Sequence, residues 1–399
     1  MQDLTRCVVK PEVSLDGFSS LAVPTYRAST IVFPDAGAYA TRAQRGPDGY
    51  SYGLQGTPTT RTLEAQINGL HDASGTVLLP SGQAAIAVAM LALLLPGDKV
   101  LIPDSCYPPV KEFCERYLGE RGIAYAVYAP LAGAAIADAM DGTIKLVWVE
   151  SPGSTTMEVQ DLAAIAEVAH RHGALVGCDN TWATPLLFKP LKHGADLVVE
   201  ALTKYIGGHS DLLLGSISFG DQAVATAVRQ TMRMLGQGVS PDEVALAQRG
   251  IQTLGVRLAH SGKIAGEFAQ RLSTILPAGH VLHPALPDAP GHAEFLRDFE
   301  GASGVFSVLV PLGTETSVST ILQDLKFFAI GASWGGTRSL IAPMHIRNSR
   351  VFDAYEGLIL RVSIGLEAPE DLWDDLEALV AAMQQVIPNP DLLRTAIQS

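Results

Sequence analysis

Four chemically capable groups stand at the ends of apolar segments, or inside one. Thr203 and Lys204 follow the apolar run ADLVVEAL, and Asp179 closes the run ALVGCD. The segment Ser81-Gly82-Gln83 joins the run TVLLP to a helical pattern, and Arg361 lies within LILRVSIGLE. Charged side chains are costly to bury unless a partner satisfies them. Each of these positions therefore requires an explanation.

Each group has an ordinary explanation when it is taken alone. Lys204 can reach solvent, Asp179 can cap the next turn, and Arg361 can form an internal salt bridge. The chemical readings differ. A partly desolvated lysine amine can act as nucleophile and base. A small residue and a glycine at a strand–helix junction leave N–H groups free to bind an anion, although the same residues also make a plain tight turn.

One ligand system would satisfy all four groups together. A pyridine aldehyde phosphate would place its phosphate on the helix end at Gly82 and Gln83 and its protonated ring nitrogen on Asp179. Lys204 would form a Schiff base with the aldehyde. Arg361 would hold the carboxylate of an amino-acid substrate.

The elements that must position these groups alternate along the chain from Thr76. We expect strands at TVLLP, KVLIP, IAYAVYA, IKLVWVE, ALVGCD, ADLVVEAL and LLLGSISF, and helices at GQAAIAVAMLALL, at about 109–119 and at DLAAIAEVAHRHG. This alternation predicts a mostly parallel sheet covered on both faces. Ligands of such sheets bind beyond the carboxyl ends of the strands.

The two ends of the chain have different patterns. Residues 1 to about 58 are rich in Pro, Gly, Ser and Thr and are predicted to form an irregular arm. Beyond about Phe219 the chain turns helical, with a capping signal formed by Ser240, Pro241 and Glu243. The last 120 residues or so mix strands and helices, which indicates a smaller α+β domain.

Composition excludes several classes of protein. The 399 residues carry 28 Lys+Arg against 41 Asp+Glu, a net charge of −13, which argues against nucleic-acid and anionic-membrane partners. The N-terminus has no signal pattern and no apolar run is long enough for a bilayer, so we expect a cytoplasmic protein. The four cysteines show no close pairing and are predicted to be reduced core thiols, and no metal site is expected. His170 and His172 are interpreted as surface residues.

Over nearly its whole length the chain resembles the Cys/Met-metabolism family of pyridoxal-phosphate (PLP) enzymes of fold type I, and within it the bacterial cystathionine β-lyases. The signature lies in VESPGSTTMEVQDL and DNTWATPLLFKPLKHGADLVVEALTKYIGGHSD. Supporting matches are YRAST, GTPTTRTLE, SPDEVALAQRGIQTL and LRVSIGLE. The resemblance implies an α/β fold with a mostly parallel seven-stranded sheet. It also implies an arm at 1–58 that contributes to the neighbouring subunit, a large PLP-binding domain at 59–250 and a smaller α+β domain at 251–399.

The resemblance also implies roles for individual residues. Lys204 matches the Schiff-base lysine and Asp179 the partner of the ring nitrogen; Gly82 and Gln83 match the phosphate-binding amides. Thr203 matches a phosphate-binding hydroxyl, and Tyr107 a tyrosine that stacks on the ring. For the substrate, Arg361 matches the arginine that binds the carboxylate, with Ser333 and Trp334 beside it. Tyr52 matches a tyrosine supplied across the dimer to the neighbouring active site, where the resemblance implies contact with the cofactor and the substrate and, as for Tyr107 and Lys204, a part in catalysis. The family assembles as dimers that pair into tetramers, so a homotetramer with shared sites is expected.

Four residues at three sites depart from the family pattern. Leu54 stands where relatives carry an arginine that reaches the cofactor phosphate of the neighbouring subunit, and Ala201 where some carry a serine. Thr337-Arg338 replaces an aromatic residue and a glutamate, which bears on the substrate. A tryptophan at position 334 resembles β-lyases more than γ-lyases.

The expected activity is β-elimination of L-cystathionine to homocysteine, pyruvate and ammonia. The alternatives are γ-elimination, γ-replacement or racemisation in the same family. A protein that binds PLP without catalysing a reaction is a further alternative.

Overall fold

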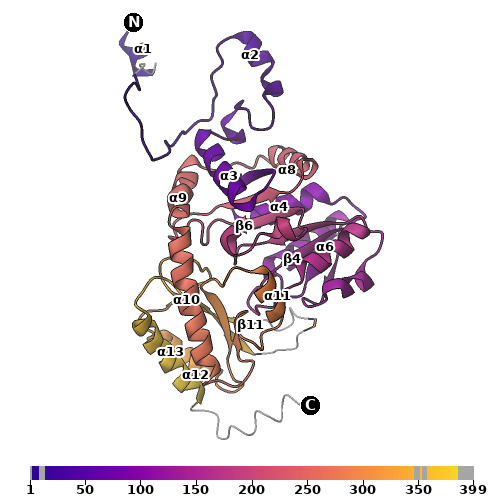
Figure 1. Ribbon diagram of the computed structural model, residues 1–399. Helices are drawn as coiled ribbons and strands as arrows, with labels where there is room; N and C mark the ends of the chain where they lie inside the picture. Colours follow the sequence, from indigo (N-terminus) through magenta and orange to yellow (C-terminus); the bar gives the residue numbers. More distant parts are fainter. Residues whose placement is uncertain (1, 9–13, 346–350, 353–356, 385–399) are drawn as a thin grey trace.

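The computed structural model describes residues 2–8, 14–345, 351–352 and 357–384 (Figure 1). A seven-stranded sheet lies at the centre of its larger part. Its strands are β1 (Gly75–Leu79), β2 (Lys99–Pro103), β3 (Ala124–Tyr128), β4 (Ile144–Glu150), β5 (Leu175–Asp179), β6 (Leu197–Ala201) and β7 (Gly215–Phe219). They lie in the order β1-β7-β6-β5-β4-β2-β3. Strand β7 runs antiparallel to both of its neighbours, and the other neighbouring pairs are parallel. The predicted mostly parallel sheet is confirmed.

Helices cover both faces of this sheet. They are α3 (Pro58–His71), α4 (Gly82–Leu93), α5 (Pro108–Glu112), α6 (Leu162–Arg171), α7 (Thr184–Leu187), α8 (Gln222–Met234) and α9 (Pro241–Ile251). Successive strand residues point to opposite faces, so Val198 and Val199 of β6 enter different cores. The core with Val198 includes α3 and α6, and the core with Val199 includes α4 and α8.

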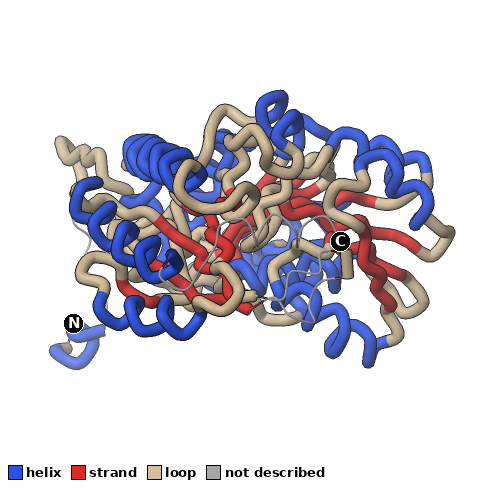
Figure 2. The backbone as a smooth tube through the Cα atoms, turned by 90° about the horizontal axis from the view of Figure 1, so that it is seen from below, coloured by secondary structure: helices blue, strands red, loops and turns tan. Residues whose placement is uncertain are grey.

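A second, five-stranded sheet forms with the C-terminal part of the chain. Its strands are β8 (Val281–Leu282), β9 (Val305–Leu309), β10 (Ala329–Ile330), β11 (Leu340–His345) and β12 (Leu358–Ser363), in the order β10-β11-β12-β9-β8. The helices of this part are α10 (Leu254–Ser273), α11 (His292–Asp298), α12 (Glu315–Asp324) and α13 (Pro369–Gln384). Phe268, Phe306, Leu360 and Trp373 share its core. Figure 2 shows helices lying outside the strands of both sheets.

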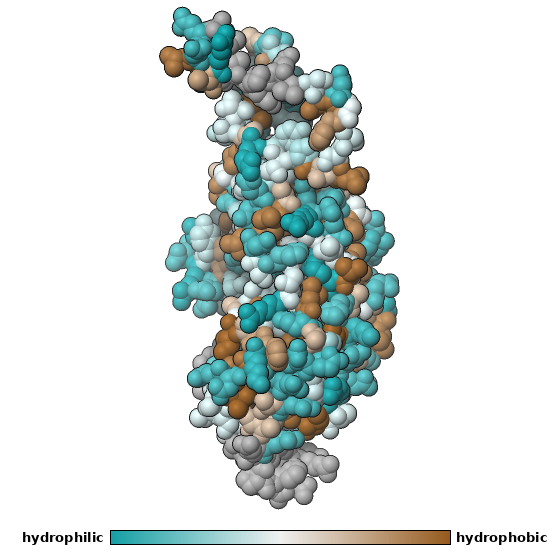
Figure 3. Space-filling model, turned by 90° about the vertical axis from the view of Figure 1, so that its left-hand side faces the viewer, coloured by the Kyte–Doolittle hydropathy of each residue, from teal (hydrophilic) through white to brown (hydrophobic). Residues whose placement is uncertain are grey.

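The N-terminal arm stands clear of the body (Figure 1). It contains α1 (Asp3–Val8) and α2 (Ala36–Ala40), and it leaves apolar side chains such as Leu15, Phe18 and Leu21 exposed. Apolar surface is visible on the arm in Figure 3. One of several attachments of the arm to the body is the hydrogen bond that the Tyr26 N–H donates to Thr59 Oγ1 at 2.8 Å. In its described residues the arm is therefore largely irregular, with two short α-helices and two 3₁₀ turns, Arg42–Arg45 and Gly53–Gln55.

Several local expectations differ from the structure. Helix α3 was not predicted as an element because its sequence is Thr-rich, although Thr57 caps it and Pro58 begins it. The expected helix at 109–119 changes winding after Glu112 into a π-helical turn at Phe113–Leu118. Strand β7 begins only at Gly215.

Two further expectations need correction. Ser240 does cap α9, but the Glu243 carboxylate accepts the Leu213 N–H at 2.8 Å, so it does not close a capping box. Cys7 is exposed, whereas Cys106, Cys114 and Cys178 are buried free thiols as expected. Among the described residues no helix is long and apolar enough to cross a bilayer.

Candidate active site

A cavity of about 240 Å³ lies beyond the carboxyl ends of the parallel strands, where the two sheets meet. Gly82, Gln83, Tyr107, Asp179, Thr203, Lys204, Trp334 and Arg361 all line it. They come from separate parts of the chain, and Arg361 comes from the second sheet. The structure therefore brings eight of the ten predicted site residues to one cavity.

Lys204 lies in the turn after β6, and its backbone N–H donates to the Ala201 carbonyl at 3.0 Å. Its Nζ donates to Ser333 Oγ at 2.7 Å, which places Ser333 beside the amine although it does not line the cavity. The Trp334 ring centroid is 5.3 Å from the same nitrogen. Burial and the positive charge of Arg361 lower the pKa of Lys204 to about 8, although Asp179 acts in the opposite direction.

Asp179 is the last residue of β5. One of its carboxylate oxygens accepts the Thr181 N–H at 2.9 Å. Burial raises the pKa of Asp179 to about 6, and the Thr181 hydrogen bond opposes that shift. A carboxylate in this position favours a cationic partner, such as a protonated ring nitrogen.

The start of α4 forms a cradle at the cavity. Ser81 caps the helix by accepting the Ala84 N–H at 3.1 Å, so the helix does not require the N–H groups of Gly82 and Gln83. A Cβ atom at Gly82 would lie 2.6 Å from the Ala201 Cβ, so a glycine lets the helix end approach β6. These features suit a phosphate.

Two polar groups complete the cradle. Gln83 Oε1 is buried without a hydrogen-bond partner in the described part of the chain. The Thr203 hydroxyl accepts the Leu214 N–H at 3.1 Å and donates to the Leu214 carbonyl at 3.2 Å, so it also anchors the turn that carries Lys204. The cradle, Asp179 and Lys204 together fit the phosphate, ring nitrogen and aldehyde of PLP.

Arg361 lies in the middle of β12 and is 8% exposed. Its Nη2 donates to the Ala332 carbonyl at 2.5 Å. In the described ranges no carboxylate forms an ion pair with it, which rules out the internal salt bridge among those residues. Its charge is therefore available to an anion in the cavity.

Glu150 is a cavity residue that the sequence reasoning missed. It ends β4 in register with Asp179 at the end of β5, and its carboxylate accepts the Tyr107 N–H at 2.6 Å. Burial raises the pKa of Glu150 well above its usual range, and the nearby Asp179 raises it further. The strand-end rule that selected Asp179 applies equally to Glu150 and could have found it.

Tyr52 does not line the cavity of its own chain and is 53% exposed. Leu54 packs against Gly238, where an added Cβ would lie 2.7 Å from Leu54 Cδ1. Among the described residues, neither Thr337 nor Arg338 lines the cavity. The Thr337 carbonyl instead accepts the Leu366 N–H at 2.8 Å.

Known proteins resemble the chain over almost its full length. A cystathionine beta-lyase of Salmonella typhimurium is 38% identical, covering 88% of this chain and 91% of its own. An L-alanine/L-glutamate racemase of Wolbachia pipientis is 36% identical, covering 91% and 93%. The crystal structure of cystathionine gamma synthase from Xanthomonas oryzae in complex with cystathionine matches with a TM-score of 0.84 and 29% identity, covering 93% of this chain and 95% of that one.

The family comparison agrees with the cavity. Residues 5–381 match the Cys/Met metabolism PLP-dependent enzyme family. The fold is that of the fold type I members, and PLP is the cofactor of the family. With its cradle, strand-end aspartate and partly desolvated lysine around one cavity, the chain belongs to the Cys/Met metabolism PLP-dependent enzymes.

Proposed function

We propose that the protein is a carbon–sulfur lyase that converts L-cystathionine to homocysteine, pyruvate and ammonia by β-elimination. The observation that carries the proposal is the meeting of Lys204, Asp179 and Arg361 at one cavity. The choice of β-elimination is supported by the 38% identical cystathionine beta-lyase and by Trp334 in the cavity wall.

The cofactor would be held by the groups already described. The N–H groups of Gly82 and Gln83 would bind its phosphate, with Thr203 beside them, and Asp179 would keep its ring nitrogen protonated. Tyr107 would stack on the ring. The hydrogen bond from its backbone N–H to the Glu150 carboxylate would hold its backbone in place. When bound, PLP supplies an electron sink for negative charge that develops at the substrate α-carbon.

Lys204 would move the protons of the reaction. With a pKa of about 8, about a tenth of its amine is neutral at pH 7, far more than for a solvated lysine, and this neutral amine can accept the α-proton. The hydrogen bond to Ser333 and the contact with Trp334 would hold Nζ in position. The β-carbon–sulfur bond of the substrate would then break, with its electron pair leaving on the homocysteine thiolate. Water would hydrolyse the remaining unsaturated three-carbon amino acid to pyruvate and ammonia.

Arg361 would orient the substrate by binding its α-carboxylate bidentately. Its guanidinium is held at the wall by the Ala332 carbonyl, so little side-chain freedom remains to be lost when the substrate binds. Ser333 and Trp334 would form the adjoining surface of the substrate site.

The site would be completed by a second copy of the chain. Tyr52 lies outside its own cavity and is exposed, which suits a side chain that enters the neighbouring subunit's site. We propose a homotetramer in which residues 1–58 contact neighbours, 59–250 bind PLP and 251–399 form the smaller domain. The exposed apolar residues of the arm support this assembly.

Racemisation is the second candidate, because a racemase is 36% identical over 91% of this chain. Racemisation also begins with removal of the α-proton but requires a proton to return to the opposite face. Tyr107, which lines the same cavity as Lys204, is a candidate donor. Leu54 favours the non-catalytic alternative only weakly, since the groups needed for chemistry are present.

The first test is product analysis after the PLP-loaded protein is mixed with L-cystathionine. Pyruvate with homocysteine is the expected result, and the Lys204→Ala variant should give neither. 2-Oxobutyrate with cysteine would instead establish γ-elimination. If the loaded protein releases no product but converts L-alanine or L-glutamate to its D-enantiomer, the racemase candidate replaces the lyase.

A further inference from the structure

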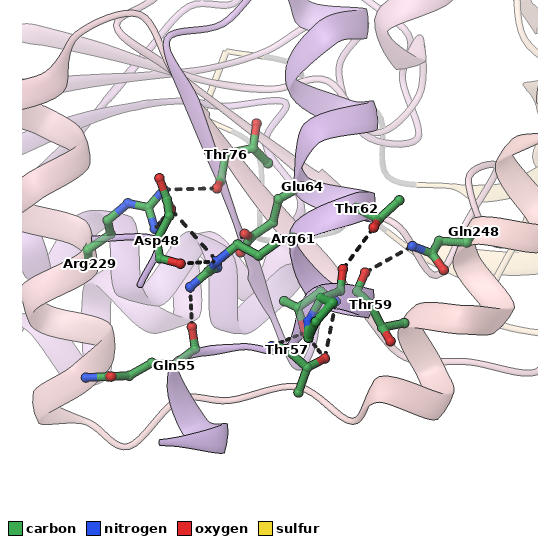
Figure 4. A network of polar contacts seen from close by, with 12 residues as sticks. Asp48, Gln55, Thr57, Thr59, Arg61, Thr62, Glu64, Thr76, Arg229 and Gln248 are labelled. Carbon is green, nitrogen blue, oxygen red and sulfur yellow. Dashed lines mark hydrogen bonds and ion pairs between the residues drawn. The ribbon is translucent and has the colours of Figure 1, made fainter. Parts of the chain in front are cut away.

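A polar network holds the segment 48–55, which carries Tyr52, against helix α3. At its centre is Arg61, one turn into the helix, with its side chain 16% exposed (Figure 4). The Arg61 Nε donates to the Asp48 carbonyl at 3.2 Å, and its Nη2 donates to the Gln55 carbonyl. A single guanidinium thus contacts the backbone at both ends of the segment.

The guanidinium is itself fixed from the helix side. Its Nη1 donates to Glu64 Oε2 at 2.5 Å, one turn further along α3. Gly56 lies directly against it, since an added Cβ would be 3.0 Å from Arg61 Nη1, and φ at Gly56 is +114°. Only a glycine combines that backbone conformation with so close an approach.

A second arginine holds the start of the segment. Arg229 of α8 forms an ion pair with Asp48 Oδ1 at 3.1 Å, and its Nη2 donates to the Thr76 carbonyl of β1 at 3.4 Å. The segment is therefore tied to α3, α8 and β1, as Figure 4 shows. On its other side the segment contacts the chain at Ser29, whose carbonyl accepts the Gly53 N–H at 2.7 Å.

The residues between the two held ends face outward. Tyr52 is 53% exposed and Leu54 is 37% exposed. The Tyr52 hydroxyl has no hydrogen-bond partner in the part of the chain that the structure describes. Two largely covered arginines thus fix the backbone of a segment whose tyrosine hydroxyl makes no hydrogen bond within the described part of its own chain.

We propose that Arg61, supported by Arg229, is a positioning residue that holds the segment 48–55 so that Tyr52 enters the neighbouring subunit's active site. This inference rests on the proposed shared site. Arg61 touches no cavity residue of its own chain and therefore acts through Tyr52 in the other subunit. Arginine is required because its planar fork reaches two carbonyls and a carboxylate at once, which a lysine ammonium on one flexible stem does not.

The test is subunit complementation between two inactive or weakened variants. Arg61→Met should lower kcat by at least about tenfold as a homo-oligomer, because Tyr52 is misplaced. Lys204→Ala should be inactive. In a hybrid dimer, one site combines the intact Lys204 of the first chain with the intact Arg61 of the second. Random equal mixing should then restore about a quarter of the wild-type activity, since half of the dimers are hybrids with one whole site each.

The controls separate this inference from the proposed assembly. Tyr52→Phe mixed with Lys204→Ala should show the same recovery. If that pair recovers and the Arg61→Met pair does not, Arg61 acts within its own chain and the positioning role is wrong. If neither pair recovers, the shared site is wrong, and this inference falls with it.

Two further variants guard against misfolding. Arg61→Lys keeps a cation beside the buried Glu64, but its kcat should still fall almost as far as that of Arg61→Met. Arg229→Met should lower kcat to a lesser degree. Arg116→Met, which removes an exposed ion pair with Glu112, should change nothing.

A readout independent of turnover is the release of PLP on dialysis, followed by absorbance. Release should be faster in Arg61→Met than in wild type or Arg116→Met. Equal release rates would overturn the proposal even if the natural substrate proves to be another amino acid.

Discussion

The chemistry of Lys204 depends on a balance between burial and two charged neighbours of the amine. Burial and Arg361 disfavour its ammonium form, whereas Asp179 favours it, and the net effect is a pKa of about 8. The amine therefore needs no dedicated base to become neutral. The same arginine that would bind the substrate carboxylate also prepares the lysine to react.

The pH dependence of Lys204 acylation in the apoprotein tests this balance. Half-maximal reactivity with acetic anhydride should fall near pH 8, and Arg361→Met should move it upward because a neighbouring positive charge is removed. The extent of labelling at the peptide that contains Lys204 can be measured by mass spectrometry. A midpoint that is unchanged in Arg361→Met would show that Arg361 does not contribute to the lowered pKa of Lys204.

Asp179 should reduce the stability of the apoprotein. Burial raises its pKa to about 6 in the folded state, so the folded chain binds more protons than the unfolded chain, and stability falls as the pH rises from about 4 to 6. Asp179→Asn removes the charge. At pH 7.5 the apo variant should therefore be more stable by about 2–3 kcal/mol.

Urea denaturation of both apoproteins at pH 7.5 and pH 5 measures that difference, which should be smaller at pH 5. Added PLP should stabilise wild type more than the variant, because only the carboxylate can pair with a protonated ring nitrogen. A variant that is less stable than wild type at pH 7.5 would contradict the assignment of an unpaired, costly carboxylate.

Much of the site at the residue scale could be predicted from sequence. Lys204 and Asp179 follow apolar runs, and parallel strands bring their carboxyl ends to one edge. Glu150 obeys the same rule, but the rule alone does not separate it from a strand-end glutamate that is solvated. The Ser333 contact with Lys204 Nζ could not be derived, since it joins segments whose distance depends on how the two sheets meet.

At the element scale, the segment that carries Tyr52 and Leu54 is decisive. The resemblance to the family implies that Leu54 stands at the position of a phosphate-binding arginine; here Leu54 packs on Gly238. Leu54→Arg should therefore tighten PLP retention on dialysis. A charge-assisted phosphate contact contributes about 1.5–3 kcal/mol, which corresponds to roughly one to two decades in affinity.

Leu54→Met is the matched control, because it keeps an apolar side chain of similar size, and it should leave retention unchanged. Equal retention in Leu54→Arg and wild type would mean that another cation already contacts the phosphate.

The elements themselves were predicted unevenly. Apolar strands such as β4 and β6 are continuous runs, and their burial on both faces leaves little ambiguity. Helix α3 is hard to predict because its threonines add no apolar periodicity to its first turns. Its capping box is formed by Thr57 and Thr60. The winding change after Glu112 cannot be read from a sequence that would suit an ordinary helix equally well.

At the scale of the whole molecule, the active site depends on how the parts of the chain meet. Lys204 comes from the larger sheet and Arg361 from the smaller one, so their separation is set by packing between the two. The arm adds a second dependence, because it projects from the body and exposes apolar residues (Figure 1). Composition indicated ample apolar surface but could not show where that surface is exposed.

The arm provides the last prediction. Leu15, Phe18 and Leu21 lie before its attachment at Tyr26 and are 71%, 70% and 105% exposed. Exposed apolar side chains of this number are stabilised only when another surface covers them. Removal of residues 1–23 leaves Pro24, whose carbonyl accepts from Thr59 Oγ1 at 2.9 Å, together with Tyr52 and Arg61. The truncated chain should therefore keep its site but form a smaller assembly.

Sedimentation of both proteins at matched concentrations measures this effect, with PLP retention as the test of an intact site. The expected mass falls from four chains to two, with retention per chain preserved, because the segment 48–55 remains held by Arg61 and Arg229. An unchanged mass would show that the apolar residues before Tyr26 do not bind a neighbour. Loss of PLP together with loss of mass would instead assign the arm to the dimer that builds the site.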